Sequence, residues 1–290
     1  MSRAIALLAN PSAGGGRALA AREAAAGRLR DAGLDCVLLT GADAAGTTHL
    51  ARQAVADGVD AVVAVGGDGT VHAAVQALAG TGVALGTVPC GTGNDVARYL
   101  GIPRDDPVAA ADRVVAARTR RIDLARSGAT YFVTVLAAGF DALVNERANG
   151  MRRPRGRSRY TLATLAELRT FTPRDYVLDL DGVARRTPAM LVAVGNGPSF
   201  GGGLRITEGA VLDDGLLDVV VIRPMSRAGL VRTYPTLYRG THTGHPAYER
   251  HRVRRVTLAA PGIVAYADGE RFGPLPLTVE CAPGALEVLA

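Results

Sequence analysis

The chain has 290 residues, of which 48% are hydrophobic and 21% are charged. These proportions fit a globular protein of about two domains and exclude a disordered chain or a coiled coil. All 33 basic residues are arginine, and the net charge is +6. Because the chain contains no lysine, a Walker-type P-loop, a lysine-dependent protein kinase site and a pyridoxal Schiff base are excluded.

The first part of the chain alternates between short apolar runs and helical patterns. We expect strands at residues 4–9, 34–40, 60–65 and 83–88, and helices at residues 17–32, 46–57, 71–79 and 95–100, with one more helix within 103–120. Apolar runs that are continuous and separated by helices indicate a parallel sheet covered on both faces. Residues 1–121 are therefore predicted to form a doubly wound α/β domain. We leave open whether the last few residues of the chain return to it.

From Ile122 onward the pattern changes to short strands. We expect strands at residues 131–137, 176–180, 189–194, 217–222, 254–259, 263–267, 277–281 and 286–289, and helices at residues 160–171 and 226–238. Asp181-Gly182 is a hairpin turn signal. Residues 122–290 are therefore predicted to form a β-rich sandwich domain.

The cysteines and the apolar runs indicate the cellular compartment of the protein. Cys36, Cys90 and Cys281 lie far apart and lack metal-ligand spacing, which indicates a reducing cytoplasm. No apolar stretch approaches the ~18 residues that cross a bilayer. If the protein works on a membrane, we expect it to bind there peripherally.

Three glycine-rich loops follow three of the strands expected in the first domain. Their sequences are NPSAGGG at residues 10–16, GGDGT at residues 66–70 and GTGND at residues 91–95. In a parallel α/β sheet all three lie at the carboxyl edge, where backbone amides and helix N-termini bind phosphate groups. Asp68 among such amides indicates a divalent cation bridging it to the phosphates. The alternative for Asp68, Asn94 and Asp95 is an ordinary helix N-cap.

The succession of these loops resembles the diacylglycerol kinase catalytic domain family, which includes soluble bacterial lipid kinases and the sphingosine and ceramide kinases. The resemblance continues through GFDA at residues 139–142, GNG at 195–197, GGG at 201–203, DGLLD at 214–218 and DGE at 268–270. GGDGT alone is shared with NAD kinases and relatives of phosphofructokinase, so the resemblance implies a first domain of that fold. The chain departs from the family at residues 204–210 (LRITEGA) and at Val133-Thr134.

The resemblance implies a Mg²⁺-dependent lipid kinase that uses ATP. The matching positions hold ATP at Asn10, Thr40, Gly66, Gly67, Asp68, Gly69, Thr70, Val71, His72, Gly91, Thr92, Asn94 and Asp95. Catalysis is implied for Asp68 and for Glu270 as the acceptor of the lipid hydroxyl proton. A structural Mg²⁺ is implied at Asp214 and the backbone of Val211 and Leu216.

Several residues have a second interpretation. Glu270 follows an apolar strand at an Asp-Gly turn and could be an ordinary hairpin acid. His72 could contact a nucleotide or simply begin a helix. His242, His245 and His251 have no metal-ligand periodicity and are expected at the surface. No G-x-S-x-G elbow is present, so serine hydrolase chemistry is not expected.

Arginine is concentrated in one segment, residues 147–159 (RANGMRRPRGRSR), which holds six. Residues 1–120 are neutral, and residues 121–290 carry the whole +6. The segment is a solvated loop or a contact to an anionic membrane. Nucleic-acid binding is not expected, since only Tyr160 stands beside the arginines.

Taken with the resemblance, the residues predict a cytoplasmic, peripherally membrane-associated enzyme that phosphorylates a lipid hydroxyl, with diacylglycerol giving phosphatidic acid as first choice. The lipid is expected in the cleft between the domains, and a homodimer is left open. Two alternatives are kept: an NAD kinase-like phosphotransferase and a catalytically silent nucleotide-binding regulator.

Overall fold

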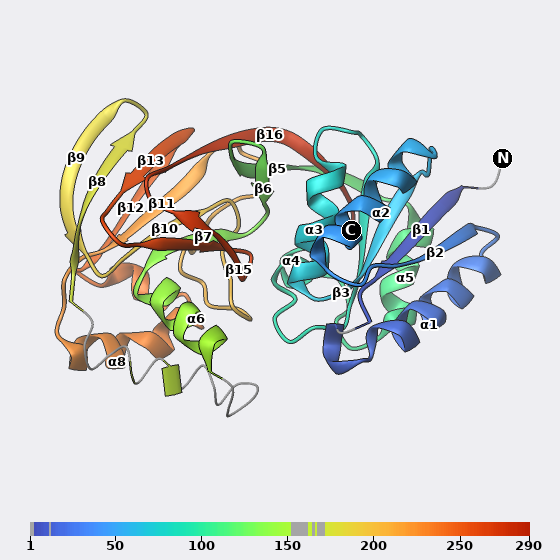
Figure 1. The fold of residues 1–290 in the computed structure, drawn as a ribbon, viewed down its shortest axis with the longest axis horizontal. Helices are drawn as coiled ribbons and strands as arrows, with labels where there is room; N and C mark the ends of the chain where they lie inside the picture. The colour runs from blue at the N-terminus through green and yellow to red at the C-terminus, as the bar shows by residue number, and fades with distance from the viewer. Residues whose placement is uncertain (1–2, 12, 152–161, 164–165, 167–171) are drawn as a thin grey trace.

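Two lobes lie side by side in the computed structural model, which describes residues 3–11, 13–151, 162–163, 166 and 172–290 (Figure 1). The first lobe contains four parallel strands in the order β2-β1-β3-β4. Their bounds are β1 Ala4–Ala9, β2 Asp35–Thr40, β3 Ala61–Gly66 and β4 Ala84–Pro89. The helices are α1 Ala18–Asp31, α2 Ala44–Ala56, α3 Asp68–Leu78, α4 Asp95–Tyr99 and α5 Pro107–Ala116, with the 3-10 turn η1 at Ala13–Gly15.

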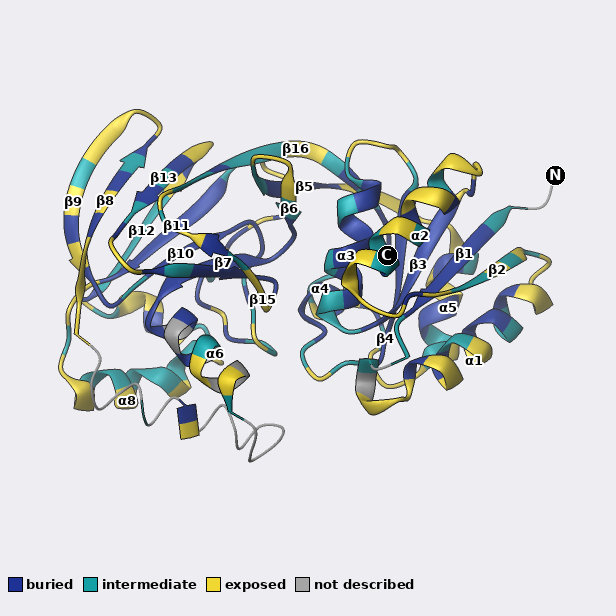
Figure 2. Cartoon of the chain, in the orientation of Figure 1, coloured by how far each residue is buried: buried dark blue, intermediate teal, exposed yellow. Residues whose placement is uncertain are grey.

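Both faces of the first sheet are covered, because successive strand residues point to opposite sides. Ile5 and Leu7 pack in one core with α1 and α5, while Ala6 and Leu8 pack in another with α2 and α3. Every residue of β3 and β4 is buried, as the dark blue ribbons in Figure 2 show. The prediction of a doubly wound α/β domain is confirmed.

The second lobe is a sandwich whose core lies between two antiparallel layers. One layer is a six-stranded sheet, β12-β11-β10-β7-β14-β15. Its strands are β7 Val135–Gly139, β10 Leu191–Gly195, β11 Leu217–Ile222, β12 Tyr248–Val253, β14 Val264–Ala267 and β15 Glu270–Pro274. The other layer contains β8 Arg174–Leu180, β9 Val183–Ala189, β13 Arg255–Ala259 and part of β16 Leu277–Leu289. The predicted β-rich sandwich is confirmed.

Strand β16 belongs to both lobes. Its first half pairs with β13, whereas Val288 pairs with Leu85 of β4 in the first sheet. It also pairs antiparallel with β5 (Thr119–Ser127), which continues into β6 (Thr130–Phe132). We predicted two strands here, but the chain forms one strand with an irregular register between Ala282 and Leu286. The end of the chain thus returns to the first sheet (Figure 1).

Several elements were not predicted from the sequence. They are strands β5, β9, β12 and β15, the helix α6 at Phe140–Gly150 and the 3-10 turn η2 at Thr241–Gly244. Strand β12 (YERHRV) is polar on both sides, so it carries no apolar pattern. The predicted strand at residues 131–137 is divided between β6 and β7. The predicted helix at residues 226–238 is α8, Arg227–Leu237. Most of the one at residues 160–171 and most of the arginine-rich segment lie outside the described residues.

Candidate active site

The carboxyl ends of β1, β3 and β4 bring the three glycine-rich loops together around an open cavity of about 430 Å³. The second lobe contributes the turn between β14 and β15. The residues that line the cavity are Asn10, Ala13, Ala44, Thr47, Gly67, Asp68, Gly69, Thr70, Ala73, Gly91, Thr92, Gly93, Asp268, Gly269 and Glu270. The loops that we placed at one edge of the sheet therefore line one cavity between the lobes.

Two of the glycine loops touch backbone to backbone. A Cβ atom placed on Gly91 would lie 2.6 Å from the Cα of Gly67, and one on Gly93 would lie 2.4 Å from Oδ2 of Asp68. Real Cβ atoms do not approach other atoms so closely. Glycine is therefore required at these positions by the contact between the loops.

Asp68 links the second and third loops. Its Oδ2 accepts a hydrogen bond from Asn94 N at 2.8 Å, and its Oδ1 accepts one from Asp95 N at 2.7 Å. Burial and the nearby Asp95 raise the pKa of the Asp68 carboxyl to about 6. Asp68 is the first residue of α3 after the N-cap Gly67, so it is not the N-cap that we considered. It presents a carboxylate among backbone amides, which suits a cation-bridged phosphate.

Asn94 and Asp95 support the third loop. Asn94 closes the loop by bonding both backbone groups of Gly91, at 3.1 Å to N and 2.9 Å to O. Asp95 is buried and reaches the second lobe: its carboxylate accepts from Gly202 N at 2.7 Å and from Ser199 Oγ at 3.1 Å. Asp95 therefore joins the lobes rather than lining the cavity.

Glu270 begins β15 and is exposed at the mouth of the same cavity. A Cβ atom on Gly69 would lie 2.8 Å from Oε1 of Glu270, so the carboxylate sits against the first turn of α3. The tertiary structure thus brings Glu270 and Asp68, 202 residues apart, into one site.

Asp268 is a site residue to which our sequence reasoning gave no role, although it stands in the DGE motif. It is buried, and its carboxylate accepts from Val133 N at 3.0 Å, Thr134 N at 2.8 Å and Thr134 Oγ1 at 2.7 Å. Nδ1 of His72 lies 3.0 Å from Oδ2 of Asp268 and is the fourth polar partner of this carboxylate. Burial opposes a charge on either side chain, but the contact between them outweighs it, so the pKa of His72 is raised and that of Asp268 is lowered.

Six residues expected to hold ATP are not among those that line the cavity: Thr40, Gly66, Val71, His72, Asn94 and Asp95. Asn94 and Asp95 support the third loop, and Gly66 is the last residue of β3. Thr40 is exposed at the end of β2, where its Oγ1 lies 2.6 Å from the guanidinium of Arg22. Val71 is buried in the core between α3 and the sheet. His72 faces Asp268.

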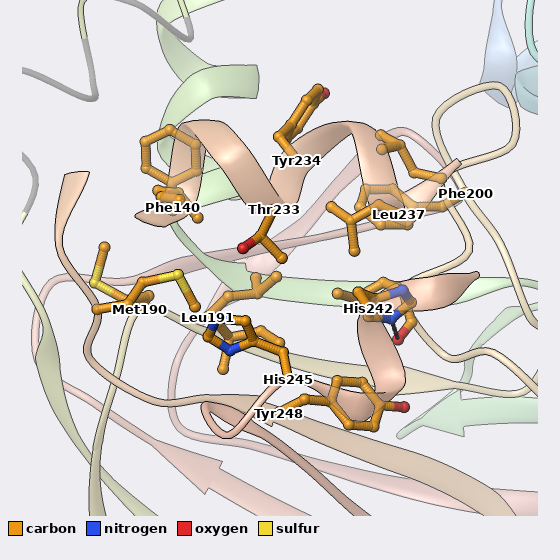
Figure 3. A pocket seen from close by; sticks show the side chains of 15 residues that line it. Phe140, Met190, Leu191, Phe200, Thr233, Tyr234, Leu237, His242, His245 and Tyr248 are labelled. Carbon is orange, nitrogen blue, oxygen red and sulfur yellow. Dashed lines mark hydrogen bonds between the residues drawn. The ribbon is translucent and has the colours of Figure 1, made fainter. Parts of the chain in front are cut away.

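A second, narrow cavity of about 60 Å³ lies in the second lobe (Figure 3). Its lining is largely apolar: Phe140, Met190, Leu191, Phe200, Leu204, Ile206, Ile222, Met225, Leu230, Thr233, Tyr234, Leu237, His242, His245 and Tyr248. Helix α8 supplies Leu230, Thr233, Tyr234 and Leu237, whose spacing places them on one face of the helix. No pattern in the sequence indicates this cavity, because its walls come from segments far apart in the chain.

The expectation that His242 lies at the surface is wrong. His242 is only 3% exposed and forms a wall of the second cavity, with its ring edge-on to Tyr248 at a centroid distance of 5.1 Å. Burial lowers its pKa, so it is neutral at pH 7. His251 is half-buried on β12 and pairs with Glu249.

Comparison with protein families finds two matches that together span nearly the whole chain. Residues 4–127 match the diacylglycerol kinase catalytic domain, and residues 134–290 match the YegS C-terminal NAD kinase beta sandwich-like domain. A diacylglycerol kinase of Mycobacterium tuberculosis (strain H37Rv) is 46% identical over 288 residues, which are 97% of this chain and 93% of that protein. The chain belongs to the diacylglycerol kinase family.

Another relative agrees in sequence, and two solved structures agree in fold. The diacylglycerol kinase of Bacillus subtilis (strain 168) is 30% identical over 79% of this chain and 77% of its own. The crystal structure of a diacylglycerol kinase from Bacillus anthracis has a TM-score of 0.75 at 19% identity, covering 99% of this chain and 96% of its own. An NAD kinase from Archaeoglobus fulgidus in complex with ATP has a TM-score of 0.56 at 15% identity, covering 99% and 93%. The last two show the fold alone. Among the described residues, no helix is long and apolar enough to cross a membrane.

The residues at the first cavity fit a Mg²⁺ ion that arrives with a nucleotide. Mg²⁺ is commonly bound through one or two carboxylates together with substrate phosphates, and Asp68 offers such a carboxylate beside the glycine loops. No group of three His, Cys, Asp or Glu side chains that could hold a metal is present in the described part of the chain. A nucleotide-borne ion does not require one.

The loop implied to hold a structural Mg²⁺ does not fit that ion. Oδ1 of Asp214 accepts a hydrogen bond from Leu216 N at 3.0 Å, and Oδ2 forms an ion pair with Arg252. A fixed positive charge therefore lies against the proposed ligand, whereas the carboxylate of Asp68 accepts hydrogen bonds from uncharged backbone amides. Val211 is exposed beside them and offers its backbone alone.

Proposed function

We propose that this protein is a lipid kinase that transfers the γ-phosphoryl group of ATP to the hydroxyl of diacylglycerol and forms phosphatidic acid. The main observation behind this proposal is the position of the apolar cavity. One segment, residues 199–206, contacts both this cavity and the glycine loops. Relatives named as diacylglycerol kinases support the same activity. In this proposal residues 1–121 bind ATP, residues 122–290 bind the lipid, and the end of β16 completes the first sheet.

Residues 199–206 form the connection between the two cavities. Ser199 and Gly202 bond the carboxylate of Asp95 beside the glycine loops. Phe200, Leu204 and Ile206 of the same segment line the apolar cavity. A lipid chain held in that cavity therefore lies next to the segment that borders the phosphate site.

An apolar occupant matches the cavity better than the acceptor of an NAD kinase would. Its lining residues include no Asp, Glu or Arg, and the buried His242 is neutral. A dinucleotide carries two phosphates that need cationic or backbone partners. We therefore favour a lipid over NAD as the acceptor.

In the proposed reaction, the acceptor hydroxyl oxygen forms a bond to the γ-phosphorus while the bond to the β–γ bridging oxygen of ATP breaks. Glu270 takes the hydroxyl proton, and ADP leaves. Amides of the loops at residues 66–70 and 91–95 bind the phosphates, with Asn10 and Thr92 at the same cavity. Asp68 would hold a Mg²⁺ ion that arrives with the nucleotide, and that ion would neutralise charge on the phosphates.

The lipid substrate requires contact with a membrane. We propose that the enzyme binds the cytoplasmic surface peripherally through basic residues, among them the arginine-rich segment at residues 147–159. Each basic residue near an anionic surface contributes ~1 kcal/mol.

The test incubates the pure protein with labelled ATP and Mg²⁺ and offers diacylglycerol, sphingoid bases, ceramide or NAD. We expect label in phosphatidic acid. Transfer to NAD alone would support the NAD kinase alternative, and no transfer at all would support a silent nucleotide-binding regulator.

Two variants of helix α8 test the place of the lipid. Leu230→Arg puts a charge into the apolar cavity and should raise the KM for diacylglycerol without changing the KM for ATP. Val231→Arg is the matched control, because Val231 is 55% exposed on the same helix and does not line the cavity. Equal KM values for lipid in both variants would place the lipid elsewhere.

A further inference from the structure

Residues 213–218 (DDGLLD) carry three carboxylates, and each pairs with a different arginine. The pairs are Asp213 with Arg120 at 2.8 Å, Asp214 with Arg252, and Asp218 with Arg250 at 2.5 Å. Arg250 and Arg252 are alternate residues of β12 and therefore project from the same side of that strand. The charge of the loop is thus balanced by side chains of the chain itself.

Asp214 is the only one of these carboxylates that the family resemblance gives to a metal. Its two oxygens accept from Leu216 N and from the Arg252 guanidinium. A guanidinium stays charged at every physiological pH. A divalent cation at Asp214 would therefore have to displace Arg252 or lie beside a fixed positive charge.

The backbone of the loop is fastened independently of Asp214. Asp123 of β5 is buried, and its carboxylate accepts from Gly215 N and from Gly284 N, both at 2.7 Å. Its own backbone N donates to Leu212 O at 2.5 Å. These bonds hold the loop between β5 and β16 without a metal ligand.

We infer that Arg252 is the resident cation of this loop and takes the place of a structural metal ion, so that the second lobe keeps its fold without bound Mg²⁺. A second ion pair supports this inference. Asp218, the last residue of the DDGLLD segment, is 1% exposed, and the Arg250 guanidinium of β12 balances its charge. The inference concerns the second lobe alone and does not depend on which acceptor the enzyme phosphorylates.

The first test uses the unaltered protein. After gel filtration in metal-free buffer, elemental analysis should find no stoichiometric Mg²⁺, Ca²⁺ or Mn²⁺. The melting temperature should be the same in EDTA and in millimolar MgCl₂ without nucleotide. One tightly bound divalent ion per chain, lost in Asp214→Asn together with a lower melting temperature, would overturn the inference.

The second test changes the guanidinium. Arg252→Gln should lower the melting temperature by about 2–4 °C, which corresponds to the loss of one interaction in a protein of this size. It also frees Asp214, so MgCl₂ should restore the melting temperature with a saturable dependence. Arg252→Lys keeps a positive charge and should show no response to Mg²⁺.

Two further variants serve as controls. Arg254→Gln removes an exposed arginine just beyond β12 and should respond to Mg²⁺ like the unaltered protein. The double variant Arg252→Gln with Asp214→Asn should lose the Mg²⁺ response of the single variant. An identical response to Mg²⁺ in the Lys and Gln variants would contradict the inference. If Arg252→Gln does not fold, the metal content and EDTA melting of the unaltered protein still decide the matter. These readouts do not measure kinase activity, so failure here and failure of the proposed function are distinguishable.

Discussion

Nδ1 of His72 lies 3.0 Å from Oδ2 of Asp268, so a side chain on α3 of the first lobe contacts the turn between β14 and β15 of the second. The turn carries Glu270, and α3 begins with Asp68. Three further hydrogen bonds, from Val133 and Thr134, fix the Asp268 carboxylate. The pair therefore sets the position of Glu270 relative to the glycine loops.

Replacing His72 should weaken this contact and reveal its dependence on pH. His72 has a raised pKa in the folded protein, so its stabilisation is complete below its ordinary pKa of 6.5 and is lost as the pH rises through the raised value. The pKa of Asp268 is lowered, so its stabilisation is lost only as the pH falls through that lowered value. His72→Asn should therefore lower the melting temperature most between about pH 4 and 6.5, with a decreasing effect above that range.

The exposed His49→Asn is the control for this prediction. It should melt like the unaltered protein at every pH. A deficit in His72→Asn that is constant from pH 5 to pH 9 would show that the histidine is not charged in the pair.

Asp68→Asn should remove most turnover while leaving the fold intact. The variant keeps one acceptor for the loop amides but loses the negative charge that holds the metal-bound phosphates, and such charge stabilisation amounts to several kcal/mol. We expect a decrease in kcat of about 10²-fold or more. Circular dichroism and thermal melting check the fold, and Asp57→Asn, at the surface after α2, is the control. A well-folded, active Asp68→Asn enzyme would refute the site.

The raised pKa of Asp68 predicts that the stability of the protein depends on pH in the acidic range. Because its folded value of about 6 lies above the ordinary 3.8, the folded state holds more protons between these values. The free energy of unfolding should therefore fall as the pH rises from about 4 to about 6, by on the order of 3 kcal/mol.

The same raised pKa predicts that the protein releases protons when nucleotide binds. Binding of Mg²⁺·ATP favours the ionised Asp68 carboxylate. Calorimetry at pH 6 in buffers of different ionisation enthalpy should detect released protons, and Asp68→Asn should release fewer.

Glu270→Gln should reduce kcat by ~10²–10⁴-fold, the usual contribution of a general base. The KM for ATP should change little, because Glu270 is exposed at the mouth of the cavity and Gln keeps its size. Steady-state kinetics with diacylglycerol in mixed micelles measure both constants, with the exposed Glu23→Gln on α1 as control. An unchanged kcat would show that Glu270 is an ordinary acidic residue of a hairpin and not the general base.

The arginine-rich segment should increase binding to anionic vesicles. Replacing Arg152, Arg153, Arg155 and Arg157 by Gln removes four charges at up to ~1 kcal/mol each near the surface. We expect weaker co-sedimentation with anionic vesicles at low salt and a higher apparent KM for vesicle lipid, with the KM for ATP unchanged. The effect should shrink as salt shortens the Debye length from about 30 Å at 0.01 M to about 8 Å at 0.15 M. Equal sedimentation of both proteins would identify the segment as a solvated loop.

The sequence by itself determined the α/β class of the first lobe and the meeting of its loops. β1, β3 and β4 are continuous apolar runs, and a strand buried on both faces needs such a run whatever its neighbours are. The carboxyl ends of parallel strands share one edge, so the glycine loops and Asp68 could be placed together without coordinates.

Only the tertiary structure decided which distant groups balance the charges. Asp268 meets His72 across 196 residues of sequence, and Arg252 meets Asp214 across 38. Likewise, β12 has no apolar alternation, because its polar side chains find partners in neighbouring segments. Local patterns report how a segment faces a core, since burial acts on each side chain separately. A hydrogen bond or an ion pair depends on the relative position of two groups, which the folded chain alone defines.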